Sequence, residues 1–254
     1  MDQASFELAV QRAREIISRA RYLVAFTGAG ISTPSGIPDF RSKNSGLWER
    51  YNPMETASLT TFRTDPRRFW DWKRPLMLQM CAAQPNPAHL ALAALEAAGR
   101  LKAVITQNID GLHQRAGSQV VYELHGTITT IHCPHCRRRW PSLEFKSELE
   151  KENAIPRCPH DHTILKPDVV LFEEALPPAA WRDAETHCRQ ADAIIVAGSS
   201  LEVFPAGHLP AIAAENGAQV ILANLSPTYI DPQAAVLLPH DVAQALPALV
   251  ETLN

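Results

Sequence analysis

Three short polar segments hold the residue types best suited to chemistry, and each follows a strand-like apolar run. The first is Gly28-Ala-Gly-Ile-Ser32, the second is TQNIDGLH at 106–113, and the third is ELHG at 123–126. Glycines at a strand end let the backbone come close to a pyrophosphate at the start of a helix, where free N–H groups favour an anion. The first segment therefore predicts a dinucleotide site, with the other two along the same edge of one sheet.

The predicted site lacks two features of a hydride-transferring Rossmann domain. Such a domain has a third glycine in Gly-x-Gly-x-x-Gly and an acidic residue at the end of a second strand about 20 residues on. Here the third position is Thr33, and a long coil rich in Pro, Gly and Ser extends to Trp48. A coil that holds Asp39 and Arg41 beside a phosphate site is typical of a flap over the ligand. We therefore expect the nucleotide to be consumed as a substrate.

Strand-like and helix-like runs alternate along most of the chain. Runs that are apolar throughout, such as Ala193–Ala197, suit strands covered on both faces, and the Ala/Leu-rich stretch 88–99 ends at a glycine. This alternation predicts an α/β fold with a Rossmann-like doubly wound parallel sheet. The strands are expected at 22–27, 102–106, 119–124, 168–172, 192–197 and 219–224, and helices at 1–20, 88–99, 179–189 and 205–215.

Two segments interrupt this alternation and predict a smaller domain. Residues 42–85 contain a loop and a helix-like aromatic patch, Phe69-Trp-Asp-Trp72, and residues 131–166 contain three cysteines. We expect the first insert to cover the ligand cleft and the second to bind a metal. The predicted Rossmann-like dinucleotide-binding domain comprises 1–41, 86–130 and 167–254, with 42–85 as a cofactor-loop and helical insert and 131–166 as a zinc-binding insert.

Composition bounds the functional class. The 254 residues, 46% of them hydrophobic, suit one or two domains. A net charge of -3 leaves no basic surplus for phosphates, so no direct nucleic acid binding is expected. No run approaches the roughly 18 apolar residues that span a bilayer, which predicts no membrane contact and a cytoplasmic location. Five cysteines fit a reduced compartment and a metal site better than a disulfide framework.

The three segments belong to a longer series of motifs that follow one another from residue 28 to residue 228. They are GAGIS, GIPDFRS, GLW, TQNIDGLH, ELHGT, a cysteine-rich insert, LKPDVVLF, GSSLEVFP and NLSP. By this combination the chain resembles the sirtuins, the family of NAD-consuming protein lysine deacylases, and looks like a bacterial-type member of single-domain length. The resemblance implies acyl-lysine proteins or peptides as partners and NAD as co-substrate. The implied products are nicotinamide, the deacylated lysine and an O-acyl-ADP-ribose, with deacetylation as the first expectation.

The cysteine-rich insert has two knuckle-like turns, Cys133-Pro-His-Cys136 and Cys158-Pro-His-Asp161. Their spacings let each turn present a pair of ligands to one tetrahedral zinc. Sirtuins commonly use four cysteines here, whereas this chain has Asp161 at the fourth position. A carboxylate can ligate zinc, so we favour Asp161 as the fourth ligand, with His162 as the alternative and weakly held or absent zinc as a further one. The site is expected to be structural.

The resemblance also implies catalytic roles for three residues. His125 would act as general base on a ribose hydroxyl, a role that suits an imidazole. In the implied reaction the acyl oxygen attacks the nicotinamide ribose, nicotinamide leaves, and His125 removes a proton so that a ribose oxygen attacks the resulting imidate. Asn108 and Asp110 would hold the nicotinamide carboxamide and the ribose, and both residue types are also good helix caps.

The remaining expected contacts divide between cofactor and peptide. Cofactor contacts are expected at Gly28, Ala29, Gly30, Ser32, Ile37, Asp39, Phe40, Arg41, Trp48, Gln107, Asn108, Ile109, Asp110, Gly198, Ser199, Ser200, Asn224, Leu225, Ser226 and Val242. A substrate peptide would lie as an added strand between two segments that contain Val170, Phe172, Glu173, Glu174, Val203 and Phe204. Glu173 stands where the family usually has glycine, which would favour basic substrates or narrow the groove.

The acyl group is expected to be neutral, with acetyl first. Sirtuins that remove acidic acyl groups carry a Tyr and an Arg three residues apart, and counting back from Pro85 these positions are Lys73 and Leu76. The pair of residues that would bind a carboxylate is missing, but Lys73 or Arg74 leaves an acidic acyl group as the alternative. Alternative functions at the same NAD site are protein ADP-ribosyl transfer, NAD hydrolysis, or NAD sensing without turnover.

Overall fold

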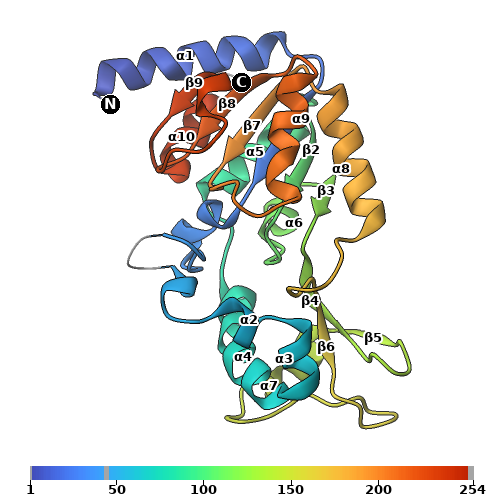
Figure 1. Cartoon of the computed structure of the whole chain (residues 1–254). Helices are drawn as coiled ribbons and strands as arrows, with labels where there is room; N and C mark the ends of the chain where they lie inside the picture. The colour runs from blue at the N-terminus through green and yellow to red at the C-terminus, as the bar shows by residue number, and fades with distance from the viewer. Residues whose placement is uncertain (1, 43–45, 251–254) are drawn as a thin grey trace.

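The computed structural model describes residues 2–42 and 46–250, which form a larger and a smaller lobe (Figure 1). The coil predicted at 33–48 therefore includes three residues, 43–45, that lie outside the described part. Within the described ranges, no helix combines the length and the apolar character needed to cross a membrane.

The larger lobe is built on a six-stranded sheet in which every pairing is parallel. The strands β1 (Leu23–Thr27) and β7 (Ala193–Ala197) are buried along their whole length, as expected of strands covered on both faces. The predicted doubly wound α/β fold is confirmed. In spatial order the strands are β3 (Val121–Glu123), β2 (Leu101–Thr106), β1 (Leu23–Thr27), β7 (Ala193–Ala197), β8 (Gln219–Ala223) and β9 (Ala234–Leu238).

Helices cover both faces of this sheet (Figure 1). One hydrophobic core joins it to α1 (Gln3–Arg19), α5 (Pro87–Ala97) and α10 (Val242–Val250). A second core joins the other face to α8 (Pro178–Gln190) and α9 (Leu209–Glu215). The helices predicted at 1–20, 88–99, 179–189 and 205–215 are confirmed to within a few residues at each end.

The smaller lobe combines a three-stranded antiparallel sheet with short helices around a third core. The sheet has the order β5-β4-β6. Its strands are β4 (Gly126–His132), β5 (Arg139–Pro141) and β6 (Lys166–Val169), and its helices are α2 (Pro53–Thr56), α3 (Leu59–Thr64), α4 (Pro66–Ala82) and α7 (Lys146–Leu149). The aromatic patch 69–72 is part of α4, as predicted. The remaining short elements are α6 (Leu112–Ala116) and the 3₁₀ helices Ala29–Ile31, Thr33–Ser35, Leu47–Glu49, Ser142–Phe145, Ala206–His208 and Asp231–Gln233.

One predicted strand of the main sheet is wrong. The segment at 168–172 does not join that sheet, because β6 ends at Val169 and pairs antiparallel with β4. The main sheet has β9 instead, which was not predicted. An apolar run predicts extended backbone but not its partner, because pairing depends on contacts distant in sequence. The division into residue ranges stays a prediction, and the second sheet reaches a few residues beyond the insert 131–166 on each side.

Candidate active site

The predicted chemical segments meet at one edge of the main sheet, where the carboxyl ends of the strands lie. The chain order reverses there, since β1 lies between β2 and the much later β7. Ligands of open parallel sheets bind at such a switch point. Two cavities open at this edge and share part of their lining, including Gln107, Asn108 and His125.

The polar cavity, of about 550 Å³, lies over the loops that follow β1, β7 and β8 and over the start of α10. Most of the predicted cofactor residues line it, and Gly28 lines neither cavity. The predicted residues that do so are Ala29, Gly30, Asp39, Phe40, Arg41, Gln107, Asn108, Gly198, Ser199, Ser200, Asn224, Leu225, Ser226 and Val242.

Gly28 and Gly30 let two loops touch. A Cβ on Gly28 would lie 2.8 Å from the Cβ of Ser199, and one on Gly30 would lie 2.9 Å from the Cα of Gly198. The Gly30 amide donates to the Gly198 carbonyl at 2.8 Å, so this amide is not free for a phosphate. The glycines therefore shape the polar cavity by closing the loops after β1 and β7 onto each other.

The loop after β1 is organised by its own side chains. Asp39 Oδ1 accepts from the amides of Arg41 and Ser42 at 3.0 and 2.7 Å. Arg41 Nε lies 3.1 Å from Glu202 Oε2, and all of these residues line the polar cavity. This ion pair links the predicted flap to the loop after β7.

Gln107 presents an unpaired donor at the junction of the cavities. Its Oε1 accepts from Ser199 Oγ at 3.0 Å, whereas its buried Nε2 has no hydrogen-bond partner among the described residues. Leaving such a donor unpaired costs about 1–3 kcal/mol. A ligand oxygen would satisfy it, so this site fits the hydroxyls of a ribose.

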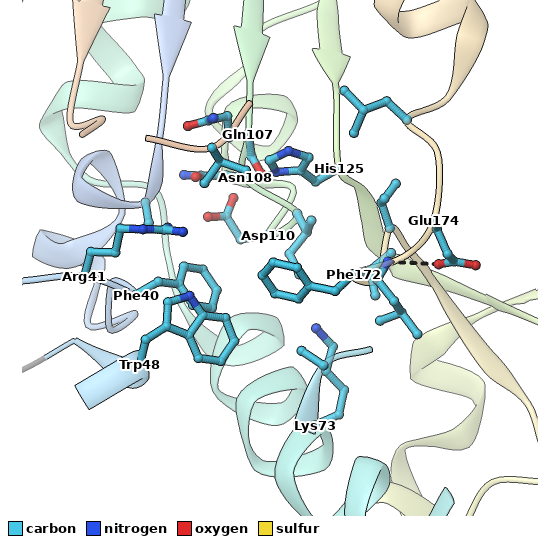
Figure 2. A pocket seen from close by; sticks show the side chains of 18 of the residues that line it. Phe40, Arg41, Trp48, Lys73, Gln107, Asn108, Asp110, His125, Phe172 and Glu174 are labelled. Atoms are coloured by element: carbon cyan, nitrogen blue, oxygen red, sulfur yellow. Dashed lines mark hydrogen bonds between the residues drawn. The ribbon is translucent and has the colours of Figure 1, made fainter. Parts of the chain in front are cut away.

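His125 lines both cavities, and Figure 2 shows its ring beside Gln107 and Asn108. Its Nδ1 is 3.0 Å from the carbonyl oxygen of Gln107. Since a carbonyl only accepts, Nδ1 carries the proton and Nε2 keeps a free lone pair. Burial lowers the pKa of His125, and this outweighs the raising effect of the bond to Gln107; the charge of Arg41 also lowers the pKa. The imidazole is therefore neutral near pH 7 and able to accept a proton.

Asn108 and Asp110 are joined through one hydroxyl group. Ser32 Oγ donates to Asp110 Oδ2 at 2.7 Å and accepts from Asn108 Nδ2 at 3.0 Å. Asp110 Oδ1 accepts from the amide of Leu112 at 2.9 Å. Burial raises the pKa of Asp110, against the effect of these hydrogen bonds. The network fixes both side chains next to His125 (Figure 2).

Two buried histidines support this network, and they were not predicted. His89 Nδ1 accepts from the Asn86 amide at 3.3 Å and its Nε2 lies 3.4 Å from Ser32 Oγ. His113 Nε2 lies 2.9 Å from Thr27 Oγ1, and the two rings are 4.9 Å apart. Burial lowers the pKa of His89 to about 4 and that of His113 well below its usual value. Both histidines are neutral. The available signal was the Asn-x-x-His capping box at the start of α5.

The aromatic cavity, of about 720 Å³, extends from His125 into the smaller lobe. Trp48 stacks on Trp72 at 5.8 Å and lies 5.0 Å from Phe40 and 6.1 Å from Phe172, measured between ring centroids. These rings make the cavity largely apolar. Val203 lines both cavities. The predicted residues that line the aromatic cavity and not the polar one are Ser32, Ile37, Trp48, Ile109, Asp110, Val170, Phe172, Glu173, Glu174 and Phe204.

The segment after β6 forms one wall of this cavity. The Phe172 amide donates to Ala57 at 3.1 Å and its carbonyl accepts from Leu59 at 3.1 Å. Glu173 has φ of 76°, a backbone conformation that glycine adopts without strain. Its carboxylate accepts from the Thr60 amide at 2.8 Å, at the start of α3. The glutamate at a usual glycine position is thus directed to a helix terminus.

The cysteine cluster brings four donors together. The ligand atoms of Cys133, Cys136, Cys158 and Asp161 all lie within 4.8 Å of one another, and the sulfurs of Cys136 and Cys158 are 3.7 Å apart. Two thiolates on a tetrahedral zinc at about 2.3 Å would be roughly 3.8 Å apart. The donor set is therefore compatible with a structural zinc. His162 is absent from this group, and its backbone amide donates to the Cys158 carbonyl in a turn.

The sheet, the switch-point cavity and the adjoining aromatic cavity define a Rossmann-like dinucleotide-binding protein with room for a second substrate. The Sir2 family model matches residues 28–205, and the chain belongs to this family. It is 45% identical over 246 residues, 96% of each chain, to NAD-dependent protein deacylase 2 of Archaeoglobus fulgidus.

Solved structures agree with this assignment. One described as "Structural Basis for the Mechanism and Regulation of Sir2 Enzymes" is 44% identical, with a TM-score of 0.90 over 97% of this chain and 98% of that one. A Sir2 complex with a deacetylated p53 peptide and 3'-O-acetyl-ADP-ribose is 37% identical, with a TM-score of 0.90 over 95% and 97%.

Proposed function

We propose that this protein is an NAD-consuming protein lysine deacylase, with acetyl-lysine as its first substrate. The products would be nicotinamide, the deacylated lysine and an O-acyl-ADP-ribose. The observation that carries the proposal is His125, whose free Nε2 lies between a polar cavity and an apolar one. The names of the relatives support the same activity.

The polar residues where the two cavities adjoin would have different roles in the reaction. When bound, NAD supplies an electrophilic ribose carbon with nicotinamide as the leaving group. Asn108 and Asp110 would orient the nicotinamide and the ribose through the network around Ser32. Gln107 would donate its unpaired N–H to a ribose oxygen. His125 would take a proton at Nε2 from a ribose hydroxyl, while the apolar walls of the aromatic cavity exclude water.

A substrate peptide would bind at the mouth of the aromatic cavity. Phe172 and Phe204 line this cavity, and both are exposed although they are large and hydrophobic, at 36% and 62% of their surface. The segments around them would pair with the peptide backbone as neighbouring strands. Zinc, held by the three cysteines and Asp161, would stabilise the smaller lobe that supplies one of these segments. We expect the protein to act in the cytoplasm, since its cysteines are all free.

The test is nicotinamide release from NAD by the purified protein. The reactions contain an unmodified peptide or the same peptide with an acetylated, butyrylated or long-chain-acylated lysine. Release that requires an acylated peptide, with O-acyl-ADP-ribose as a product, is expected. Equal release with and without peptide would instead establish NAD hydrolysis or ADP-ribosyl transfer.

A further inference from the structure

A buried ion pair joins the two ends of the segment 167–173, which forms one wall of the aromatic cavity. Lys166 begins β6 and Glu174 follows the segment, and Lys166 Nζ lies 2.8 Å from Glu174 Oε2. The two side chains are only 8% and 24% exposed. In a fully extended chain the Cα atoms of these residues would be about 26 Å apart. The pair therefore requires the chain to turn back before Glu174.

The same two side chains bind the backbone that lies between them. Lys166 Nζ donates to the Val169 carbonyl at 2.8 Å, and Glu174 Oε2 accepts from the Leu171 amide at 2.9 Å (Figure 2). The Glu174 amide in turn donates to the Leu171 carbonyl at 3.0 Å, which forms the turn. Val169 and Leu171 are buried, so their backbone groups need partners inside the protein. The two charged side chains supply such partners.

The alternate residues of the segment are joined to the proposed base and to the smaller lobe. The Val170 amide donates to the His125 carbonyl at 2.8 Å, and both backbone groups of Phe172 bind at the junction of α2 and α3. Successive residues of an extended chain direct their backbone groups to opposite sides, so the ion pair holds one side of the segment and these contacts hold the other. The backbone groups of Glu173 have no partner among the described residues, which leaves them free for a peptide.

We propose that the Lys166–Glu174 pair positions the segment 167–173 relative to His125, and that Lys166 is thus a positioning residue for the reaction. This inference rests on the proposed deacylase function, because it concerns how that site holds its peptide. Lys166 lines neither cavity, so it would act through the segment and not by contact with a ligand. Removing one partner would leave the other charge buried and unpaired, and the segment would move.

The experiment measures kcat and the peptide KM with an acetyl-lysine peptide at saturating NAD, and NAD affinity by calorimetry. In Lys166→Met the peptide KM should rise about 10- to 100-fold, the effect of displacing a substrate-positioning group by about 1 Å. The kcat at saturating peptide and the NAD affinity should change little. Glu174→Gln keeps the shape of the side chain and should raise KM in the same way, whereas Lys166→Arg keeps the cation and should restore KM toward the wild-type value.

A double variant tests whether the two residues act as one unit. With Lys166→Met and Glu174→Gln together, no unpaired charge remains in the buried site. The KM of the double variant should therefore be no higher than that of the worse single variant. Single effects that multiply would show two independent roles and would overturn the proposal.

Lys146→Met is the matched control, because Lys146 forms an exposed ion pair with Glu150 in the same lobe, at 3.6 Å. It removes the same charge and should leave the peptide KM unchanged. The inference alone would be overturned by a rise in KM equal to that of this control, by an unchanged KM in both single variants, or by losses of kcat and NAD affinity that merely follow the folded fraction. Absence of nicotinamide release by the wild-type protein with every acylated peptide would overturn the proposed function itself.

Discussion

The polar and aromatic cavities meet at His125 but are constructed differently. The polar cavity is formed by segments that follow strands of one sheet, and its shape depends on backbone contacts such as that between Gly30 and Gly198. The aromatic cavity is formed by side chains from α4, the loop after β1 and the segment after β6. The comparison teaches that the cavity proposed to bind the nucleotide is fixed by the main sheet, whereas the cavity proposed to bind the acyl group depends on the packing of the smaller lobe.

The largest effect is expected at the residue that the two cavities share. His125→Ala removes the proton acceptor, so kcat for deacylation should fall by about 10²- to 10⁴-fold. NAD affinity, measured by calorimetry, should change little, because the ring makes only one hydrogen bond among the described residues, to the Gln107 carbonyl, and backbone contacts join the loops after β1 and β7. Unchanged deacylation would remove His125 from the base role, and lost NAD binding would show that the two cavities are not separable.

The pH profile sharpens the same test. A base must be neutral to act, and burial lowers the pKa of His125 from its usual value near 6.5. The neutral form therefore persists to lower pH, and the acid limb of kcat/KM should lie below pH 6.5. His125→Ala should lack this limb in its residual activity. A limb above pH 7 would contradict the assigned environment of the imidazole.

Substitution of a zinc ligand tests whether the polar cavity and the smaller lobe are independent of each other. Cys158→Ser should release zinc and destabilise the smaller lobe by at least about 3 kcal/mol, which corresponds to roughly 10 °C in Tm. Peptide turnover should be lost while NAD still binds to the main sheet. Metal content and thermal unfolding measure these effects.

Two variants identify the fourth zinc ligand. Asp161→Ala should weaken zinc binding in the same direction as Cys158→Ser, because its carboxylate lies within the cluster. His162→Asn is the control, since asparagine tolerates the positive φ of 60° at this position. The reverse pattern, with zinc retained in the first variant and lost in the second, would assign the ligand to His162.

The smallest expected effect concerns the wall of the aromatic cavity. Glu173→Gly and Glu173→Ala both lose the bond to Thr60, but only glycine adopts the left-handed backbone of this position without strain. The glycine variant should therefore be more stable than the alanine variant by about 1 kcal/mol. Denaturant unfolding gives the difference, and equal stabilities would mean that the backbone changes when the carboxylate is removed.

The sequence predicted most of the segments that line the polar cavity, because their determinants are local. Apart from the segment after β9, the loops of the polar cavity follow strands that apolar runs identify, and parallel strands bring their carboxyl ends to one edge. The acyl side was predicted less well. The segment 168–172 was assigned to the wrong sheet and the antiparallel sheet was not predicted, because strand pairing joins distant parts of the chain. The partners of His89 and His113 likewise come from other elements.

The position of β1 at the centre of the sheet has a consequence for synthesis of the protein. Its partner β7 follows it by roughly 170 residues, which takes about 10–30 s at usual elongation rates. Until β7 is synthesised, the backbone groups of β1 on that side have no partner strand, although β1 has already emerged from the ribosome. Because residues that follow β7 and β8 line the polar cavity, nucleotide binding can assist only the last stage of folding.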